Sequence, residues 1–475
     1  MFDLVIIGAG VVGTSIAREM SRYKLKICLV EKEEELAFGV SKSNSGIIHP
    51  GTQVSPDSLK GKLCVQGNFI TAKIACELGV DFKKVGELIL AFNEEEIIRL
   101  HQLRQDAQRL RVPGIRLVDQ VWLAKNEPNL SPKVMAALFA PTAGIISPYR
   151  LVYGLAENAL ANGCQVHTSA LVDRIESINH EFVVFTSRGE FKSRFVINCA
   201  GLFADEISRM VGIDNFSIKP VKGEEFILDK KLQNLTRHLI FPLPTKATKG
   251  VLIIKTADGN PMIGPSAEEV GDKTDLTTSE EALQKVLLSA QKMVPAISDK
   301  DIIAYFAGLR PVAGDDFIIR HENKVPGFVN VAGIQSPGLT AAAAIAVMVR
   351  DILKNNGLQL KNKLFFRNRR PKITQLSVVN FFQMKKLIKT DPAYGDIVCR
   401  CEMVSAREIR EAIERGAKTL DGIKFRTRCQ AGRCHGSFCT TRVMKILAEQ
   451  RNIPLTEITK RGKGSEIIKN ERTSN

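Results

Sequence analysis

The sequence predicts an α/β fold: a Rossmann-like dinucleotide-binding domain, an inserted antiparallel α+β domain, and a small helical module at the C-terminus. Residues 1–31 alternate strand, glycine turn, helix and strand. Residues 216–270 mix apolar runs with turn signals, which is typical of an antiparallel sheet. Five of the ten cysteines lie between Cys399 and Cys439, and they indicate a separate C-terminal unit.

The size and composition of the chain indicate a multidomain globular protein. At 475 residues the chain exceeds one hydrophobic core, so two or three domains are expected. No uninterrupted apolar run reaches 18 residues, which argues against a membrane-spanning helix. The N-terminus, Met1–Asp3, lacks the basic lead of a signal peptide. We therefore expect a cytoplasmic protein.

Positive charge is concentrated between Lys354 and Lys389, where ten Lys or Arg residues occur without an Asp or Glu. One interpretation is a solvated basic linker. The others are a surface for an acidic partner subunit, or for peripheral association with the inner face of the cell membrane. No nucleic-acid-binding motif accompanies this charge, so nucleic acid is not an expected partner.

The opening strand–turn–helix–strand has the pattern of a parallel βαβ unit. Phe2–Ile7 and Lys26–Val30 are nearly continuous apolar runs, as expected for strands buried on both faces. Val11 to about Arg22 has helical spacing of its apolar residues. Further β-like runs follow at Val166–Ile175, Phe182–Thr186 and Phe195–Asn198.

The turn between the first strand and helix, Gly8–Gly13 (GAGVVG), is a G-x-G-x-x-G motif in the context that it requires. Gly8 makes the tight turn, and Gly10 lets the backbone approach a pyrophosphate. Gly13 lets the helix pack closely on the strand. Glu31, 18 residues later at the end of the next strand, is placed to accept ribose hydroxyls. A dinucleotide site is therefore predicted.

Related segments far downstream favour FAD over NAD as the dinucleotide. Val196–Gly201 (VINCAG) is a strand that ends in a small-residue turn, and Val329–Gly333 (VNVAG) is another. Ser336–Thr340 (SPGLT) then opens a helix whose N–H groups would face the pyrimidine end of a flavin. The cofactor-contacting residues expected from these segments are Ala200, Gly201, Gly333, Gly338, Leu339 and Thr340.

These segments, in this order, resemble the FAD-dependent oxidoreductase family that shares its fold with D-amino-acid oxidase, over residues 1–355. The resemblance implies that Gly39–His49 runs past the flavin, with Ser45 and Gly46 against it. It also implies that the backbone of Val172 contacts the adenine. The expected FAD-binding parts are about 1–80, 145–215 and 325–355, and the substrate domain is about 81–144 and 216–324.

The C-terminal cysteines form a C-x-C pair and, after 32 intervening residues, a C-x4-C pair. Four thiolates suit an iron–sulfur cluster. The spacing resembles the [2Fe-2S] module typified by bacterioferritin-associated ferredoxin, which implies the ligands Cys399, Cys401, Cys434 and Cys439. Cys429 is then a neighbouring free thiol. Structural zinc, with His435 or Cys429 as a ligand, and simple buried thiols are the alternatives.

The order of the parts is a flavin core, a basic linker at 356–395, the cluster module at 396–450 and a tail at 451–475. This order resembles the large subunits of anaerobic glycerol-3-phosphate dehydrogenases, and Asp258–Pro265 and Gly308–Pro311 are further family-like segments. The resemblance implies oxidation of glycerol 3-phosphate to dihydroxyacetone phosphate, with electrons passed through the cluster to a partner subunit. Asn44–His49 and Lys62–Asn68 also resemble L-2-hydroxyglutarate oxidases.

Hydride transfer from a carbon bearing OH or NH to flavin N5 requires a base. His49 is the first candidate, because imidazole titrates in the useful range. Arg310 is the candidate to bind a small anionic substrate, and Lys255 could add a second positive charge. Tyr305 is a further candidate.

Three functions follow as hypotheses. The first is a glycerol-3-phosphate dehydrogenase, and the second is the same scaffold acting on a 2-hydroxy acid or an amino or imino acid. The third is an electron-transfer or scaffold subunit with a degenerate pocket. A phosphate requires two or more cations near the flavin, whereas one Arg and a hydroxyl suffice for a carboxylate.

Overall fold

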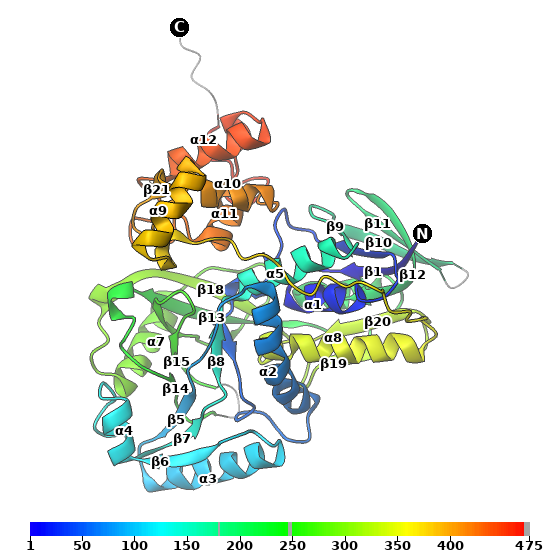
Figure 1. Cartoon of the computed structure of the whole chain (residues 1–475). Coiled ribbons are helices and arrows are strands. Elements are labelled where there is room, and N and C mark those ends of the chain that lie inside the picture. The colour runs from blue at the N-terminus through cyan, green and yellow to red at the C-terminus, as the bar shows by residue number, and fades with distance from the viewer. Residues whose placement is uncertain (179–180, 246–248, 470–475) are drawn as a thin grey trace.

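The computed structural model describes residues 1–178, 181–245 and 249–469. Two large sheets lie side by side, and a small helical module sits above them at the end of the chain (Figure 1). The predicted α/β class, with an inserted sheet domain and a C-terminal helical module, is confirmed.

The first sheet has a parallel centre built from strands far apart in sequence. Ile7 at the end of one central strand pairs with Val30 and Asn198 on either side. The carboxyl ends of the parallel strands therefore meet at one edge, where α/β proteins bind ligands. In spatial order the parallel strands are β9 (Gln165–His167), β2 (Ile27–Val30), β1 (Phe2–Ile7), β12 (Gly189–Asn198) and β20 (Phe328–Ala332).

Antiparallel strands extend this sheet at one end. β10 (Val172–Ile178) and β11 (Glu181–Thr186) form a hairpin against the first half of β12, and β19 (Ile318–His321) pairs with β20. The hairpin and α6 (Ala204–Arg209) cover one face of the sheet.

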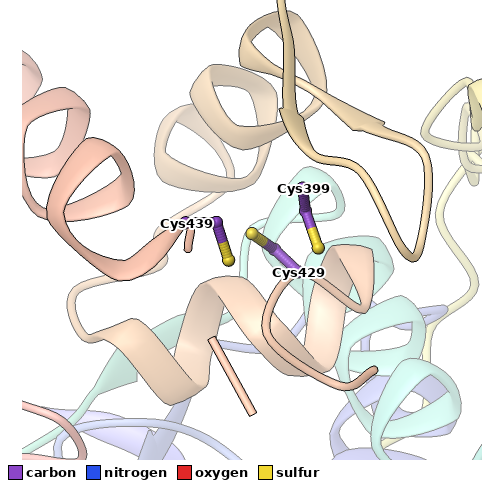
Figure 2. A group of neighbouring side chains, drawn as sticks. All are labelled: Cys399, Cys429 and Cys439. Carbon is purple, nitrogen blue, oxygen red and sulfur yellow. The ribbon is translucent and has the colours of Figure 1, made fainter. Parts of the chain in front are cut away.

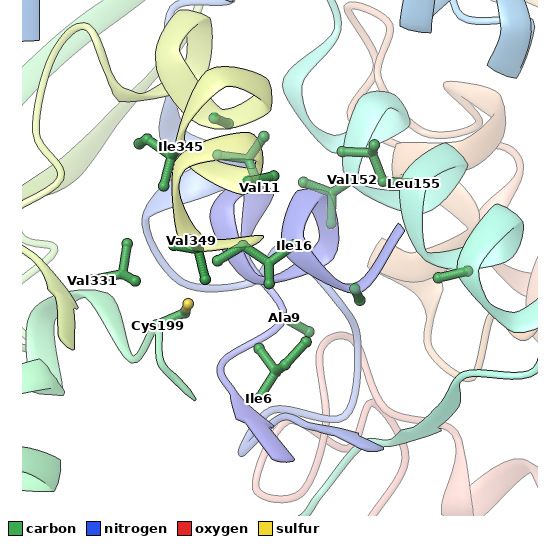
Figure 3. Packing of buried hydrophobic residues seen from close by; sticks show 14 of the residues in the cluster. Ile6, Ala9, Val11, Ile16, Val152, Leu155, Cys199, Val331, Ile345 and Val349 are labelled. Atoms are coloured by element: carbon green, nitrogen blue, oxygen red, sulfur yellow. The ribbon is translucent and has the colours of Figure 1, made fainter. Parts of the chain in front are cut away.

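Four helices share one hydrophobic core on the other face of the first sheet. Ile16 of the first helix lies beside Val349 and Val152 of two others (Figure 3). Close packing is possible because Gly67 lies against the backbone of Thr340, where a Cβ would come within 2.0 Å of the carbonyl oxygen. The four helices are α1 (Val11–Met20), α2 (Leu59–Leu78), α5 (Pro148–Ala161) and α8 (Gly338–Asn355).

The second sheet forms the inserted domain. Its longest pairing joins β13 (Lys219–Leu228) to β18 (Ile302–Val312), and all its pairings are antiparallel except that of β5 with β14. The two strands of that pair come from separate excursions of the chain. The remaining strands are β5 (Glu87–Ala91), β6 (Arg116–Asp119), β7 (Ala136–Ala140), β14 (Leu239–Phe241), β15 (Leu252–Lys255), β16 (Pro261–Gly264) and β17 (Glu268–Glu269).

Helices cover the two faces of the second sheet. α7 (Glu280–Met293) and α4 (Gln120–Asn126) share one hydrophobic core with it, and α3 (Glu94–Arg109) shares the other. A third, small sheet contains β3 (Ile47–Ile48), β8 (Gly144–Ile146) and β4 (Phe82–Lys84).

The C-terminal module has its own hydrophobic core. A buried ion pair between Arg426 and Glu35 attaches it to the first domain. The chain reaches the module through α9 (Phe381–Thr390), which has no buried residue. The module contains β21 (Ile397–Cys399), β22 (Val404–Ser405), α10 (Ala406–Glu414), α11 (Leu420–Thr427) and α12 (Thr440–Arg451). Within the described residues, no helix is both long and apolar enough to cross a membrane.

Candidate active site and cluster site

A cavity of about 650 Å³ is lined by residues of both large sheets. This volume lies in the range of small-molecule and cofactor sites. At one end lie Glu31 and Val172, and at the other His49 and Arg310. The predicted site residues that line it are Gly8, Gly10, Glu31, Ser45, His49, Val172, Ala200, Gly201, Arg310, Gly338 and Leu339.

The glycine turn has the close approaches that a dinucleotide site needs. Gly8 has φ +102°, and a Cβ there would lie 2.4 Å from the carbonyl oxygen of Cys199. A Cβ at Gly13 would lie 1.9 Å from the Gly8 carbonyl oxygen, so α1 packs directly on the turn. Glu31 accepts the backbone N–H of Ala9 through Oε2, at 2.8 Å. The turn and the carboxylate are thus held together, as an FAD adenosine and pyrophosphate require.

Ser41 is a site residue that sequence reasoning missed. Its Oγ accepts the N–H of Val11 at 2.9 Å, at the N-terminus of α1, and it lines the cavity. The signal lay in Gly39–His49, the segment expected to run past the flavin.

His49 lies at the opposite end of the cavity, just after β3. Its backbone N–H donates to Thr340 Oγ1 at 2.9 Å, and its carbonyl oxygen accepts from Asn68 Nδ2 at 3.0 Å. Burial, and then the positive charge of Lys249, lower the pKa of the His49 imidazole well below 6.5. The ring is therefore neutral at pH 7 and can accept a proton.

Two cations face the same end of the cavity. Arg310 on β18 donates from Nη2 to the Ser266 carbonyl oxygen at 3.0 Å, which orients the guanidinium. Lys249 also lines the cavity, and burial lowers the pKa of its ammonium. Lys255, the lysine proposed from the sequence, is the last residue of β15 and does not line the cavity. Of the two lysines, Lys249 is the one that lines the cavity.

Glu225 is a second residue that sequence reasoning missed. It is a buried side chain on β13, it lines the cavity, and its Oε1 accepts from Ser45 Oγ at 2.9 Å. Burial raises the pKa of this carboxyl to about 7. Tyr305, the further candidate, is 61% exposed on β18 and does not line the cavity.

Four predicted cofactor residues lie beside the cavity rather than in its wall. Gly13 packs α1 on the turn, and Thr340 bonds to the backbone N–H of His49. Gly46 and Gly333 have φ of +74° and +65°, a region that glycine adopts without strain. All four shape the backbone around the site.

The cluster cysteines lie together in the C-terminal module. The Sγ atoms of Cys399, Cys429 and Cys439 are all within 4.8 Å of one another and point toward a common centre (Figure 2). Cys401 Sγ lies 3.7 Å from Cys399 Sγ, and the charge of Cys434 acts on Cys401. Cys429, expected beside the site, is thus among its innermost sulfurs.

The residues around the sulfurs fit a [2Fe-2S] cluster. The ion-binding group within the described residues consists of thiols only, the donors that iron–sulfur clusters use. Hydrogen bonding from Cys429 lowers the pKa of Cys399, which favours the thiolate form that iron binds. A Cβ at Gly432 would lie 2.4 Å from Cys401 Sγ, so this glycine leaves room for the sulfur. His435 Nε2 instead contacts the Ile303 carbonyl oxygen, at 2.7 Å.

Residues 3–352 match the FAD dependent oxidoreductase family, and residues 397–449 match the BFD-like [2Fe-2S] binding domain. The chain belongs to the FAD dependent oxidoreductase family. It is therefore an enzyme whose cofactors are FAD and a [2Fe-2S] cluster.

This oxidoreductase is similar along nearly its whole length to a glycerol 3-phosphate dehydrogenase from Caloramator mitchellensis, at 41% identity over 98% of both chains. The structure of L-alpha-glycerophosphate oxidase from Mycoplasma pneumoniae, with FAD bound, matches with a TM-score of 0.74 and 31% identity, over 78% of this chain and 98% of that one. Human mitochondrial L-2-hydroxyglutarate dehydrogenase is 30% identical, over 74% and 88% of the chains.

Proposed function

We propose that this oxidoreductase oxidises glycerol 3-phosphate to dihydroxyacetone phosphate. The observation that carries the proposal is the pair of cations, Lys249 and Arg310, beside His49 at one end of the cavity. A dianionic phosphate needs more than one cation, and Arg and Lys together supply two. The similarity to a glycerol 3-phosphate dehydrogenase and to a glycerophosphate oxidase supports the same substrate.

The chain's own residues have separate roles in this reaction. Arg310 and Lys249 bind the phosphate and orient the substrate. The neutral imidazole of His49 removes the proton of the hydroxyl on the carbon that is oxidised. Bound FAD supplies the hydride acceptor, N5. His49 and Lys249 are half-buried, and the partial loss of solvent around them strengthens both interactions.

Anaerobic titration of the holoenzyme tests the proposal. Glycerol 3-phosphate should bleach the flavin absorption near 450 nm, whereas L-2-hydroxyglutarate and L-proline should not. Bleaching by L-2-hydroxyglutarate alone would support the 2-hydroxy acid hypothesis. Bleaching by none of them would support an electron-transfer or scaffold subunit.

We further propose that electrons leave through the cluster to a one-electron acceptor protein. Cys401 is exposed at the module surface, and Phe438, next to Cys439, is 88% exposed. Arg400 directly precedes Cys401, and Arg433, which also pairs with Asp229, directly precedes Cys434; both arginines are exposed. An apolar side chain within a basic rim fits an acidic partner. Phe438→Ser should slow electron delivery to the natural acceptor without changing flavin bleaching.

Peripheral association with an anionic membrane is proposed for α9. Phe381 and Phe382 are 68% and 82% exposed, and Lys385, Lys386 and Lys389 follow on the same helix. Exposed aromatics beside lysines are typical of interfacial helices. Cosedimentation with vesicles containing anionic lipid, compared with the Phe381→Ser, Phe382→Ser double variant, tests this point. Equal binding of the two proteins would refute it.

A further inference from the structure

Glu225 has a carboxylate oxygen that accepts no hydrogen bond from the described residues. The side chain is only 4% exposed and lines the substrate end of the cavity. Its Oε1 accepts from Ser45 Oγ, but its Oε2 is buried and has no hydrogen-bond partner among residues 1–178, 181–245 and 249–469. A buried acceptor without a donor is costly, so such an atom in a cavity wall points to a ligand donor.

The surrounding backbone holds this carboxylate in place. Glu225 pairs with Phe306 in the β13–β18 ladder, the same ladder that positions Arg310 opposite Val221. A Cβ at Gly264 would lie 2.9 Å from Glu225 Cγ, so the side chain is confined from that direction. The carboxylate and the guanidinium therefore face the cavity from fixed points of one pair of strands.

Arg310 does not neutralise Glu225 through a direct contact. Their charges act on each other, but no ion pair within 4.0 Å joins them in the described part of the chain, and Arg310 Nη2 donates to the Ser266 carbonyl oxygen. The pocket thus presents separate cationic and carboxylate groups. A ligand with an anionic end and a hydroxyl end satisfies both.

We propose that Glu225 accepts the hydroxyl of the substrate farthest from the phosphate, and that it excludes compounds with a carboxylate there. This inference rests on the proposed function. A hydroxyl can donate to Oε2, whereas a substrate carboxylate can only accept and would repel Glu225. Glu225 is thus a specificity-determining residue, which selects a polyol phosphate over 2-hydroxy acids.

Two phosphates of nearly the same size test the inference. Dihydroxyacetone phosphate carries the terminal hydroxyl, and 3-phosphoglycerate carries a carboxylate at that position. Their dissociation constants are measured at pH 8 from the perturbation of the flavin spectrum in oxidised holoenzyme. The ratio of the two constants should favour dihydroxyacetone phosphate in the wild type, and Glu225→Gln should reduce this preference at least tenfold.

Two variants serve as comparisons. Glu87→Gln alters another buried carboxyl whose pKa is raised to about 7 and which does not line the cavity. Its charge acts on Lys249, so the substitution should change the two dissociation constants alike and leave their ratio unchanged. Glu225→Asp keeps the charge and should keep the preference within threefold. The FAD content of each variant shows that it is assembled.

The outcomes separate this inference from the proposed function. An unchanged ratio in Glu225→Gln, in wild-type protein that glycerol 3-phosphate bleaches, would overturn the role of Glu225 alone. Failure of glycerol 3-phosphate to bleach the wild type would overturn the proposed function. A tenfold loss of preference in Glu87→Gln as well would assign the effect to general electrostatics and would also overturn the inference.

Discussion

Arg426 of the cluster module donates to Glu35 of the FAD domain at 3.0 Å, and the two side chains are only 4% and 1% exposed. Glu35 also accepts the backbone N–H groups of Lys418 and Thr419, at 2.6 and 3.1 Å. Glu35 lies four residues after Glu31, the candidate ribose ligand. The loop that carries the candidate ribose ligand therefore also holds the cluster module.

Aromatic contacts form a second attachment between the module and the first domain. Phe38 lines the cavity, and its ring lies edge-on to that of Phe425 of α11, with 5.7 Å between centroids. Tyr149 contacts the same Phe425 ring at 4.8 Å. The module is thus fixed against residues of the cavity wall.

Replacing Glu35 with Ala should release the module. Arg426 would become a buried charge without its partner, and such losses cost about 3–5 kcal/mol. Limited proteolysis should cleave the linker faster, and electron transfer from reduced flavin to the cluster should slow. Glu33→Ala is the control, since its ion pair with Lys32 is partly exposed and is worth about 0–1 kcal/mol. Equal proteolysis of the two variants would show that the buried pair does not secure the module.

Lys249→Ala should lower kcat/KM for glycerol 3-phosphate by about a hundredfold, because one of the two proposed phosphate-binding cations is lost from a half-buried site. Lys255→Ala is the matched control. Lys255 does not line the cavity, so we expect less than a twofold effect. Steady-state kinetics with an artificial electron acceptor measures both variants. A larger loss of kcat/KM in Lys255→Ala than in Lys249→Ala would indicate that Lys255, not Lys249, binds the substrate.

The pH dependence of flavin reduction should report the neutral His49. The pKa of His49 lies well below 6.5, so its base form persists as the pH falls. We therefore expect kcat/KM to decline only at a pH below 6.5. The Lys249 charge contributes to this shift, so Lys249→Met should move the acidic limb to higher pH. Stopped-flow reduction between pH 5 and 8 measures the limb. A limb that stays in place in Lys249→Met would exclude this coupling.

The free energy of unfolding should also fall as the pH is lowered. Neutral His49 must take up a proton on unfolding at low pH, so its contribution is lost as the pH falls through the unfolded pKa of about 6.5. His49→Gln should therefore flatten the dependence of the free energy of unfolding on pH between about 5 and 7. Urea unfolding at several pH values provides the measurement, and an unchanged slope would contradict a buried neutral His49.

Cys399→Ala should lose the cluster, because Cys399 Sγ is close to the sulfurs of Cys401, Cys429 and Cys439. Cys429→Ala should retain two irons per chain, since four other thiols remain around the site. Iron analysis and the visible spectrum of anaerobically purified protein distinguish the variants. Loss of iron from Cys429→Ala would make Cys429 an essential ligand.

The local sequence determined the elements with strong patterns. Gly8–Gly13, between an apolar strand and a helix, predicted the dinucleotide turn, because only glycine permits those backbone approaches. The C-x-C and C-x4-C spacing of the cysteines predicted the cluster module, because such pairs of thiolates suit an iron–sulfur cluster. The run Val166–Ile175 was less informative: it contains the end of β9 and the start of β10, which lie at opposite ends of the sheet. A turn at positive φ, at Ser169, separates them.

The sequence by itself determined the two cofactors, the α/β class and the candidates His49 and Arg310, because each rests on short motifs that can be recognised locally, even where several motifs lie far apart in the chain. Only the tertiary structure decided that Lys249, not Lys255, reaches the cavity, and that Glu225 faces it. It also brought Cys429 among the cluster sulfurs. These choices depend on how distant strands and loops pack, and neither spacing nor periodicity along the chain encodes that packing.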